Sequence, residues 1–482
     1  MMEALNYIRG AWCASSTGLT VENRNPANRE EIVGLLPRSA KSDADAAVRA
    51  AHEALPGWRS LPGASRGDRL LQAALILERR ADEAARLLTR EMGKTLAEAK
   101  GEALRGAAIL KYYAAEGVRA NGEQIPASDG KSLLYTKKTP LGVVALITPW
   151  NFPIAIPLWK LAPALIYGNT AVLKPATNAG LTAAFLFEVF HEAGFPPGVV
   201  NLVSGSGAEL GDALARHPLV QGISFTGSNA VGRQIAQQAS RRGIKYQLEM
   251  GGKNAVIVME DADLEKAADA VVSGAMKSTG QKCTATSKVI VMQAVKEQFV
   301  ALLLKRIASI RVGDGLDAAV YCGPLATEAQ QQSVLQHIRQ GLAQGARLLC
   351  GGKQPDDPAY ASGHYVEPTV FDLVTPEMAL ACEEIFGPVL AVMEAQTLEE
   401  AIRLANQTEF GLSAAIFTRD LASAMMFTNR IEAGMVKVNA ETAGVEYQAP
   451  FGGLKQSSSH SREQGRAAMD FFTHTQTVSI SI

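Results

Sequence analysis

The sequence predicts an α/β protein in which parallel sheets carry helices on both faces. From about residue 134 onward, short apolar runs alternate with helical stretches, and this alternation is typical of parallel strands that are buried on both sides. The chain has 482 residues, which is enough for two or three domains of ordinary size. Because 47% of the residues are hydrophobic, each domain can bury a core of its own.

Charge and hydropathy exclude several classes of partner. The 47 Lys and Arg residues nearly balance the 48 Asp and Glu residues, so no overall positive field attracts nucleic acid or an anionic membrane surface. The most apolar window, residues 142–159, is interrupted by prolines and falls short of the roughly 20 apolar residues of a membrane helix. Residues 1–7 include an acid and precede no apolar run, so we expect a cytoplasmic protein without a secretory signal.

The cysteines indicate neither disulfides nor a metal site. An odd number of scattered cysteines without a CxxC pair argues against a disulfide framework and a structural zinc site, and the five are Cys13, Cys283, Cys322, Cys350 and Cys382. Free thiols fit a reducing compartment. We therefore expect no resident metal ion.

The first 120 residues are predicted to be mostly helical. Residues 42–45 have the S-x-x-[DE] form of a helix cap, and an amphipathic run follows them. A longer helical tract is expected from residue 66 to residue 103, where leucines recur at helical spacing.

A first α/β series follows. Strands are expected at residues 142–147, 170–173, 199–203 and 222–225, with helices between them at 157–167, 179–193 and 230–240. In residues 245–249 polar and apolar side chains alternate, so Glu249 points away from the apolar face at the end of a strand. That strand leads into Gly251 and Gly252, where we place the boundary to the next series.

The second series also alternates short apolar runs with helical stretches. Strands are expected at residues 254–259, 287–292, 389–393 and 414–417, and helices at 295–310 and 328–344. Two further segments, residues 121–139 and 466–482, have strand-like ends but no core of their own. They are candidates for an arm formed by strand pairing.

Cys283 is the first candidate for chemistry. Gly280 gives the backbone freedom before it, and Lys282 supplies a nearby positive charge that would favour the nucleophilic thiolate. Considered alone, a cysteine in such a protein is more often a small buried hydrophobe.

Glu249 and Asn151 are two further candidates. A carboxylate at a strand end before two glycines can project into a cleft, and a general base needs that reach. Asn151, after an apolar strand, can offer its amide to a developing oxyanion. The alternatives are an ordinary solvated acid and a turn residue held between two prolines.

A strand-to-helix turn predicts a phosphate site. Ser228 and the free backbone N–H groups of the helix that starts after it suit a pyrophosphate. Lys174 adds a cation at the carboxyl end of another strand, the edge at which open α/β sheets bind ligands. Residues 205–211 miss the G-x-G-x-x-G fingerprint by one position and are given no weight.

Taken together, these segments resemble the aldehyde dehydrogenase superfamily. Nine motifs occur in the family's order, at residues 25–27, 148–153, 173–175, 194–201, 225–228, 248–253, 280–283, 383–388 and 450–455. The resemblance implies a Rossmann-type cofactor domain (residues 1–120 and 140–251), an α/β catalytic domain (252–455) and a β oligomerisation arm (121–139 and 466–482). It also implies a homodimer or homotetramer.

The resemblance makes Cys283 the expected nucleophile of an NAD(P)-dependent aldehyde oxidation. It implies that the thiol attacks the aldehyde carbon while the side chain of Asn151 and the backbone N–H of Cys283 hold the oxyanion. Glu249 would then activate the water that hydrolyses the thioester. Transfer of the acyl group to coenzyme A is disfavoured, because Glu249 is present to activate water.

The resemblance also implies where the cofactor binds. Lys174 and Glu384 match positions at the two riboses, Ser228 matches the pyrophosphate site, and Phe386 lies beside the nicotinamide ribose. Thr177 stands where NAD-preferring members tend to have a glutamate, so NADP is expected to be accepted as well as NAD. The complete set of matching cofactor positions is Thr148, Trp150, Lys174, Thr177, Gly227, Ser228, Glu384 and Phe386.

Two departures from the family pattern indicate the substrate. Residues 455–463 lack the two glycines of the common form and resemble a branch of bacterial 2-oxoglutarate semialdehyde (2,5-dioxopentanoate) dehydrogenases. Trp159 stands where succinate semialdehyde dehydrogenases commonly have an arginine. Trp159, Lys277 and Thr284 match positions that line the family's substrate pocket. Lys277 either pairs with a substrate carboxylate or extends into solvent, as most lysines do.

Three alternatives remain open from sequence. The substrate could be succinate or glutarate semialdehyde, or the enzyme could have an apolar pocket and broad specificity. The chain could also bind a cofactor without turnover, although the joint presence of Cys283, Glu249 and Asn151 argues against this.

Overall fold

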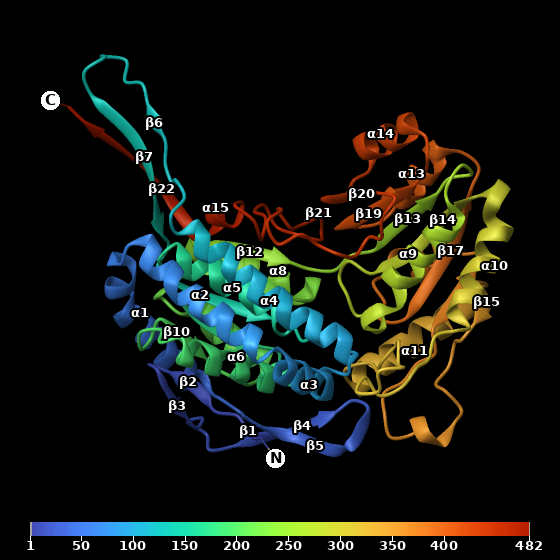
Figure 1. The fold of residues 1–482 in the computed structure, drawn as a ribbon, viewed down its shortest axis with the longest axis horizontal. Coiled ribbons are helices and arrows are strands. Elements are labelled where there is room, and N and C mark those ends of the chain that lie inside the picture. The colour runs from blue at the N-terminus through green and yellow to red at the C-terminus, as the bar shows by residue number, and fades with distance from the viewer. Residues whose placement is uncertain (1, 482) are drawn as a thin grey trace.

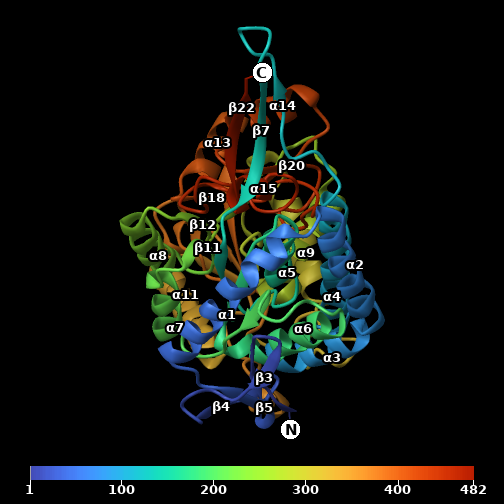
Figure 2. The ribbon, with the colours of Figure 1, turned by 90° about the vertical axis from the view of Figure 1, so that its left-hand side faces the viewer.

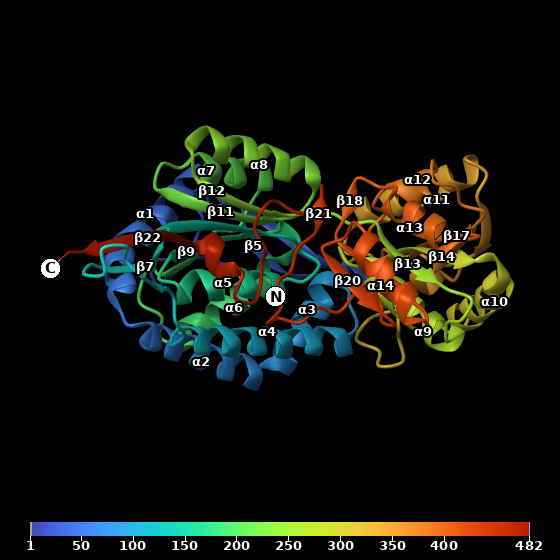
Figure 3. The same cartoon turned by 90° about the horizontal axis from the view of Figure 1, so that it is seen from above.

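The structure, a computed structural model that describes residues 2–481, contains two seven-stranded sheets that lie side by side (Figures 1 and 3). Helices pack on both faces of each sheet, which confirms the predicted α/β class. The predicted cofactor domain begins at residue 1 and the predicted arm ends at residue 482, and these two residues lie outside the described range. None of the helices in residues 2–481 is long and apolar enough to cross a membrane.

The first sheet has five parallel strands and an antiparallel pair at one edge. Its strand order is β12-β11-β8-β9-β10-β2-β3, and only β2 and β3 run antiparallel to their neighbours. The strands are β2 (Asn6–Ile8), β3 (Ala11–Cys13), β8 (Val143–Thr148), β9 (Thr170–Pro175), β10 (Val200–Leu202), β11 (Val220–Thr226) and β12 (Lys245–Glu249).

Helices α1 to α8 all belong to this half of the molecule. Successive side chains of β8 alternate between the faces: Val144 packs in one hydrophobic cluster with α5 and α6, and Val143 packs in another with α1, α7 and α8. The helices are α1 (Lys41–Ser60), α2 (Gly63–Arg79), α3 (Ala81–Met92), α4 (Leu96–Glu116), α5 (Ala155–Ile166), α6 (Gly180–Glu192), α7 (Gly207–Arg216) and α8 (Asn229–Arg242).

Two predictions about this helical region were wrong. Helix α1 begins at Lys41, because the carboxylate of Asp43 accepts the backbone N–H of Ala40 at 2.8 Å, so the cap predicted at residue 42 lies inside the helix. The tract predicted over residues 66–103 is divided among three helices. Gly93, with φ of +92°, ends α3 in a left-handed conformation that a helix cannot continue through.

The second sheet is parallel except at one edge, where β15 and β16 pair in antiparallel fashion. Its order is β15-β16-β17-β14-β13-β19-β20. The strands are β13 (Asn254–Val258), β14 (Thr286–Met292), β15 (Arg347–Cys350), β16 (Thr369–Asp372), β17 (Val389–Ala395), β19 (Ser413–Phe417) and β20 (Met435–Val438). Helices pack on both faces: α9 (Leu264–Met276), α10 (Lys296–Ile307), α11 (Glu328–Ala343), α12 (Ala379–Cys382), α13 (Leu398–Asn406) and α14 (Leu421–Arg430).

The two strand-like segments noted in the sequence pair with each other. Strand β22 (Thr473–Ile480) runs antiparallel to β7 (Leu133–Pro140), and β6 (Gln124–Ile125) adds a short third strand. Figures 1 and 2 show that this arm projects from the body of the molecule. Helix α15 (Ala468–Phe472), at its base, packs into the core of the first sheet, so residues 468–472 belong to the body.

Two small sheets complete the fold. At the N-terminal end, β5 (Asn28–Pro37) lies between β1 (Met2–Glu3) and β4 (Thr20–Asn25). A two-stranded sheet pairs β18 (Phe410–Gly411) with β21 (Leu454–Lys455).

Candidate active site

The three predicted catalytic residues come together where the two sheets adjoin. Asn151 follows β8, Glu249 ends β12, and Cys283 lies in the loop before β14. The side-chain amide of Asn151 donates to the carbonyl of Gln281 at 3.0 Å, two residues before the cysteine. The carboxylate of Glu249 is close enough to Cys283 to raise the pKa of its thiol.

The surroundings of Cys283 favour the neutral thiol. Cys283 as a whole is partly exposed. Burial of its sulfur raises the pKa of the thiol, and the charges of Glu384 and Glu249 raise it further. The expectation that Lys282 favours the thiolate was wrong. Its amine donates to the carbonyl of Ser273 at 3.3 Å, and burial lowers the pKa of Lys282 itself to about 8.

The backbone of Cys283 is tightly packed. Its carbonyl accepts a hydrogen bond from the side-chain amide of Asn254 at 2.8 Å. A Cβ atom on Gly252 would lie 2.5 Å from the same carbonyl, so only glycine fits there. The predicted pair of glycines thus lets the two halves of the molecule approach closely at the site.

Glu249 is fully buried and held on one side. The hydroxyl of Ser458 donates to its Oε2 at 2.5 Å, whereas Oε1 has no hydrogen-bond partner in residues 2–481. Burial, followed by the charge of Glu463, raises the pKa of Glu249 well above its ordinary value. The carboxylate can therefore take up a proton readily.

A buried ion pair beside Glu249 was not predicted. Lys160, within the apolar helix α5, pairs with Glu463 and donates to the hydroxyl of Ser224 at 2.9 Å. Both charged side chains are at most 2% exposed. The signal that could have found Lys160 is a single charge inside an otherwise apolar helix, because such a charge requires a partner.

A second buried pair, also unpredicted, supports the loop that carries Asn151. Lys94 pairs with Glu102 and donates to the backbone carbonyl of Asn151 at 2.8 Å. Glu102 accepts the N–H groups of Ile154 and Ala155 at 2.8 and 3.0 Å, where α5 begins. The pair thereby orders the segment between β8 and α5.

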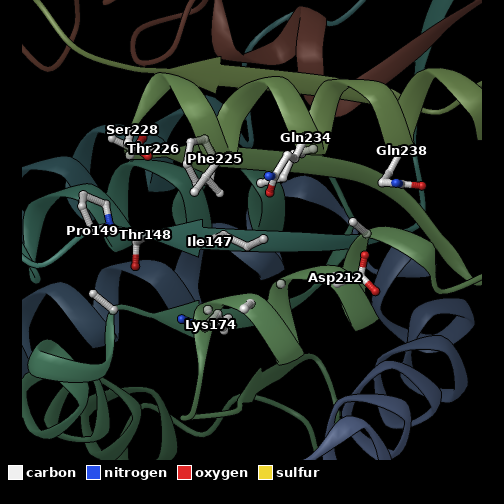
Figure 4. Close-up of a pocket in the computed structure, with 18 of the residues that line it drawn as sticks. Ile147, Thr148, Pro149, Lys174, Asp212, Phe225, Thr226, Ser228, Gln234 and Gln238 are labelled. Atoms are coloured by element: carbon white, nitrogen blue, oxygen red, sulfur yellow. The ribbon is translucent and has the colours of Figure 1, made fainter.

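A cavity of about 690 Å³, whose lining includes Trp150 next to Asn151 in the chain, lies between β8, β9 and α8 (Figure 4). Thr148 contributes a buried hydroxyl that has no partner in the described chain, and Ser228 precedes α8 without capping it through its side chain. These hydroxyls and the helix N-terminus suit the phosphates of a dinucleotide. Six predicted cofactor residues line the cavity: Thr148, Trp150, Lys174, Thr177, Gly227 and Ser228.

Lys174 lies across the cavity from Gln234 and Gln238 of α8 (Figure 4), and Thr177 also lines the cavity. The amine of Lys174 donates to the carbonyl of Pro175 at 2.8 Å, and burial lowers its pKa to about 8. The hydroxyl of Thr177 donates to the carbonyl of Gly205 at 3.2 Å. Thr177 itself carries no charge that would repel a phosphate, although the carboxylate of Asp212 also lines this cavity.

Glu384 and Phe386 lie next to this cavity rather than in its lining. The ring of Phe386 meets that of Trp150 edge to face, with centroids 5.5 Å apart. Glu384 accepts the backbone N–H of Gly252 at 3.0 Å, and burial raises the pKa of Glu384 to about 7. Six of the eight predicted cofactor residues therefore share one cavity, Phe386 contacts it through Trp150, and Glu384 lies two residues before Phe386 in the chain.

The predicted substrate residues differ in their exposure. Trp159 is buried, with its ring 5.4 Å from that of Phe451 and its indole N–H without a partner in residues 2–481. Thr284 is buried, and its carbonyl accepts the hydroxyl of Thr442 at 2.9 Å. Lys277 is exposed, so neither of its two predicted roles is excluded.

Known sequences match this chain over nearly its full length. The model of the aldehyde dehydrogenase family matches residues 12–478. The α-ketoglutaric semialdehyde dehydrogenase of Bacillus subtilis is 54% identical over 474 residues, which cover 98% of this chain and 97% of that protein. The 2,5-dioxopentanoate dehydrogenase of Saccharolobus solfataricus is 44% identical over 480 residues, 99% of each chain.

Solved structures also match the fold of this chain over nearly its full length. An NAD-dependent aldehyde dehydrogenase from Sinorhizobium meliloti superposes with a TM-score of 0.97 at 34% identity, covering 100% of this chain and 95% of that one. An NADP-dependent enzyme from E. coli gives 0.96 at 36% identity, covering 100% and 98%. Because the family model, the relatives and the solved structures all match nearly the whole chain, the protein belongs to the aldehyde dehydrogenase family.

Proposed function

We propose that the protein oxidises a short semialdehyde acid to the corresponding dicarboxylic acid, with 2-oxoglutarate semialdehyde first among the candidates. The observation that supports the chemistry is that Cys283, Asn151 and Glu249 come together, with a dinucleotide-sized cavity whose lining reaches Trp150, the residue before Asn151. The choice of substrate is supported by the names of relatives that are 54% and 44% identical. As a family member, the enzyme uses NAD or NADP.

In the first half of the proposed reaction, the sulfur of Cys283 loses its proton to water and bonds to the aldehyde carbon. The carbonyl oxygen becomes an oxyanion. The backbone N–H of Cys283 and the second amide hydrogen of Asn151 stabilise that charge, since the first amide hydrogen is bonded to Gln281. The dinucleotide, when bound, supplies the acceptor for the hydride that leaves this carbon.

In the second half, water hydrolyses the resulting thioester. Oε1 of Glu249 takes a proton from the water as its oxygen bonds to the carbonyl carbon. The carbon–sulfur bond then breaks, the acid leaves, and the thiolate returns to Cys283. Lys174, Ser228 and Glu384 would hold the ribose and phosphate groups of the dinucleotide throughout.

The finer assignments of cofactor and substrate rest on two residues. Thr177 lacks the negative charge that would repel a 2′-phosphate, which supports the use of NADP. The exposed Lys277 lies six residues before Cys283, which supports its pairing with the distal carboxylate of the substrate. Trp159 and Thr284 would line the same pocket.

We further propose that the division into domains follows the resemblance, with residues 1–120 and 140–251 binding the cofactor and 252–455 carrying the nucleophile. The arm would pair with another subunit in a homodimer or homotetramer. Free cysteines at all five positions support a cytoplasmic location.

A substrate screen tests this function. The purified enzyme is assayed with 2-oxoglutarate, succinate and glutarate semialdehydes and with neutral aldehydes of matched length, each with NAD and NADP. We expect the highest kcat/KM for 2-oxoglutarate semialdehyde, and activity with NADP. Equal kcat/KM for a neutral aldehyde would contradict the proposed substrate class.

Lys277→Ala refines the screen. If the lysine pairs with the carboxylate, KM rises for the semialdehyde acids and stays unchanged for the neutral aldehydes. The exposed Lys266 on α9 provides a matched control as Lys266→Ala. An equal rise for both classes of substrate would remove the carboxylate role.

A further inference from the structure

The serine-rich segment 457–461 lies against the end of β12, the strand that terminates at Glu249. This is the segment in which the sequence lacks the glycines of the common family pattern. Three of its hydroxyls accept hydrogen bonds from neighbouring strands: Ser457 from the N–H of Gly411 at 3.0 Å, Ser459 from the N–H of Leu248 at 2.8 Å, and Ser461 from the amide of Gln247 at 3.0 Å.

Ser458 differs from the other serines because it reaches the carboxylate. Its hydroxyl oxygen accepts the backbone N–H of Gly453 at 2.7 Å and donates to Oε2 of Glu249 at 2.5 Å. A hydroxyl has a single hydrogen, so this hydrogen is committed to Glu249. The backbones of Ser458 and Glu249 also form an isolated antiparallel bridge, which keeps the two side chains side by side.

The other carboxylate oxygen is left without a donor. Oε1 of Glu249 is buried and has no partner in residues 2–481. Gly452 faces it, and a Cβ atom at that position would lie 3.1 Å from Oε1. The two oxygens of this carboxylate are therefore in different environments: Oε2 is bonded to the hydroxyl of Ser458, and the buried Oε1 has no hydrogen-bond partner in residues 2–481 and lies beside Gly452.

We infer that Ser458 is a positioning residue for the general base: it holds Glu249 by Oε2, stabilises the negative charge, and leaves Oε1 to the hydrolytic water. This inference rests on the proposed role of Glu249. A hydrogen bond to an ionised carboxylate is stronger than one between neutral groups, so the charged form gains most from it.

The charged groups around Glu249 show why such a donor matters. Burial and then Glu463 raise the pKa of Glu249, while Ser458, Lys160 and Arg462 lower it. The thiol of Cys283 also faces the carboxylate. Without Ser458 the pKa rises further, and a larger fraction of Glu249 is protonated and inactive as a base near neutral pH.

The test compares Ser458→Ala with Ser459→Ala, a neighbouring serine that does not contact Glu249. Stopped-flow absorbance of the reduced dinucleotide measures acylation, and rapid quenching followed by mass spectrometry of the intact protein measures decay of the acyl-enzyme. In S458A we expect an unchanged burst and an acyl-enzyme decay slowed by about tenfold at neutral pH. The acid limb of the decay rate should move up by about one to two pH units.

Two further variants make the outcome decisive. Ser458→Thr keeps the hydroxyl and should restore the decay rate and its pH profile, while S459A should match the unmodified enzyme. If the acyl-enzyme decays at the wild-type rate in S458A but does not decay in Glu249→Gln, the inference about Ser458 is overturned and the proposed base is not. Wild-type decay in E249Q would instead overturn the proposed base. Loss of the burst in S458A would contradict a role confined to Glu249.

Discussion

At the scale of single residues, the site places its reactive groups where burial opposes their charge. The pKa of the Cys283 thiol is raised first by burial and then by the nearby carboxylates of Glu384 and Glu249. The thiolate is the nucleophilic form, so its population limits the reaction of the free enzyme and increases with pH. Removal of one carboxylate charge should lower the pKa of the thiol.

In the enzyme without bound cofactor, Glu384→Gln tests whether the carboxylate of Glu384 raises the pKa of the Cys283 thiol. We expect alkylation of Cys283 by iodoacetamide to increase with pH in the unmodified enzyme, with its midpoint above the ordinary range of a thiol. In E384Q the midpoint should move to lower pH by about one unit or less, since one negative charge is gone. Peptide mass spectrometry measures the rate at Cys283 alone.

The exposed neighbour Glu383 supplies the control as Glu383→Gln, for which the alkylation profile should be unchanged. A midpoint that stays fixed or moves upward in E384Q would contradict the assignment of Glu384 as a cause of the raised pKa.

At the scale of elements, two buried ion pairs connect helices to the catalytic loops. Lys94 and Glu102 join α4 to the segment between β8 and α5, and they fix the backbone carbonyl of Asn151. Removal of one partner from such a pair leaves the other charge buried without compensation, which typically costs about 3–5 kcal/mol. The loop that carries the oxyanion donor should then loosen.

Glu102→Gln should therefore lower both the unfolding midpoint and kcat, with little change in KM for the dinucleotide. The double variant Lys94→Met/Glu102→Gln removes the orphaned charge and should regain most of the stability but not kcat, because Asn151 remains without the bond from Lys94. Calorimetry and steady-state kinetics measure the two effects. Recovery of kcat together with stability would show that the pair has no positioning role.

The sequence predicted the central strands of both sheets, because buried parallel strands have continuous apolar runs, but in the second series it predicted only α10 and α11 among the helices and missed α9, α12, α13 and α14. It missed α7, whose residues 207–211 were considered only as an incomplete phosphate fingerprint. It also merged α2, α3 and α4, since apolar periodicity continues across the breaks while the left-handed Gly93 depends on local backbone geometry. Boundaries of this kind depend on turns rather than on hydrophobic pattern.

At the scale of the whole molecule, the candidate site exists only because the two sheets adjoin. Motifs that carry Asn151, Glu249 and Cys283 were found in sequence, since each is local. The direction of the Cys283 pKa shift and the pairs formed by Lys94 and Lys160 could not be predicted, because they depend on partners distant in the chain. The role of Ser458 likewise depends on contact between residues about 200 positions apart.

The arm is the other feature that belongs to this scale. Its strands pair with each other but leave apolar side chains exposed, with Leu133 at 42%, Ile480 at 47% and Ile125 at 38% exposed. If the arm pairs with another subunit, Leu133→Lys should shift the sedimentation coefficient to that of a smaller assembly, because it places a charge in an apolar interface.

Lys131→Ala, a change at an exposed polar position of the same arm, should leave the assembly intact. Monomeric sedimentation of the unmodified protein, or an unchanged assembly in Leu133→Lys, would contradict the role of the arm.

The central claim is that Cys283 forms a covalent acyl intermediate with the semialdehyde and that Glu249 is needed to hydrolyse it. Glu249→Gln, mixed with 2-oxoglutarate semialdehyde and the oxidised dinucleotide, tests both parts by mass spectrometry of the peptides. We predict a stable acyl adduct on the peptide that contains Cys283, formed only when the dinucleotide is present. The absence of an adduct, or its appearance on another cysteine, would contradict the account.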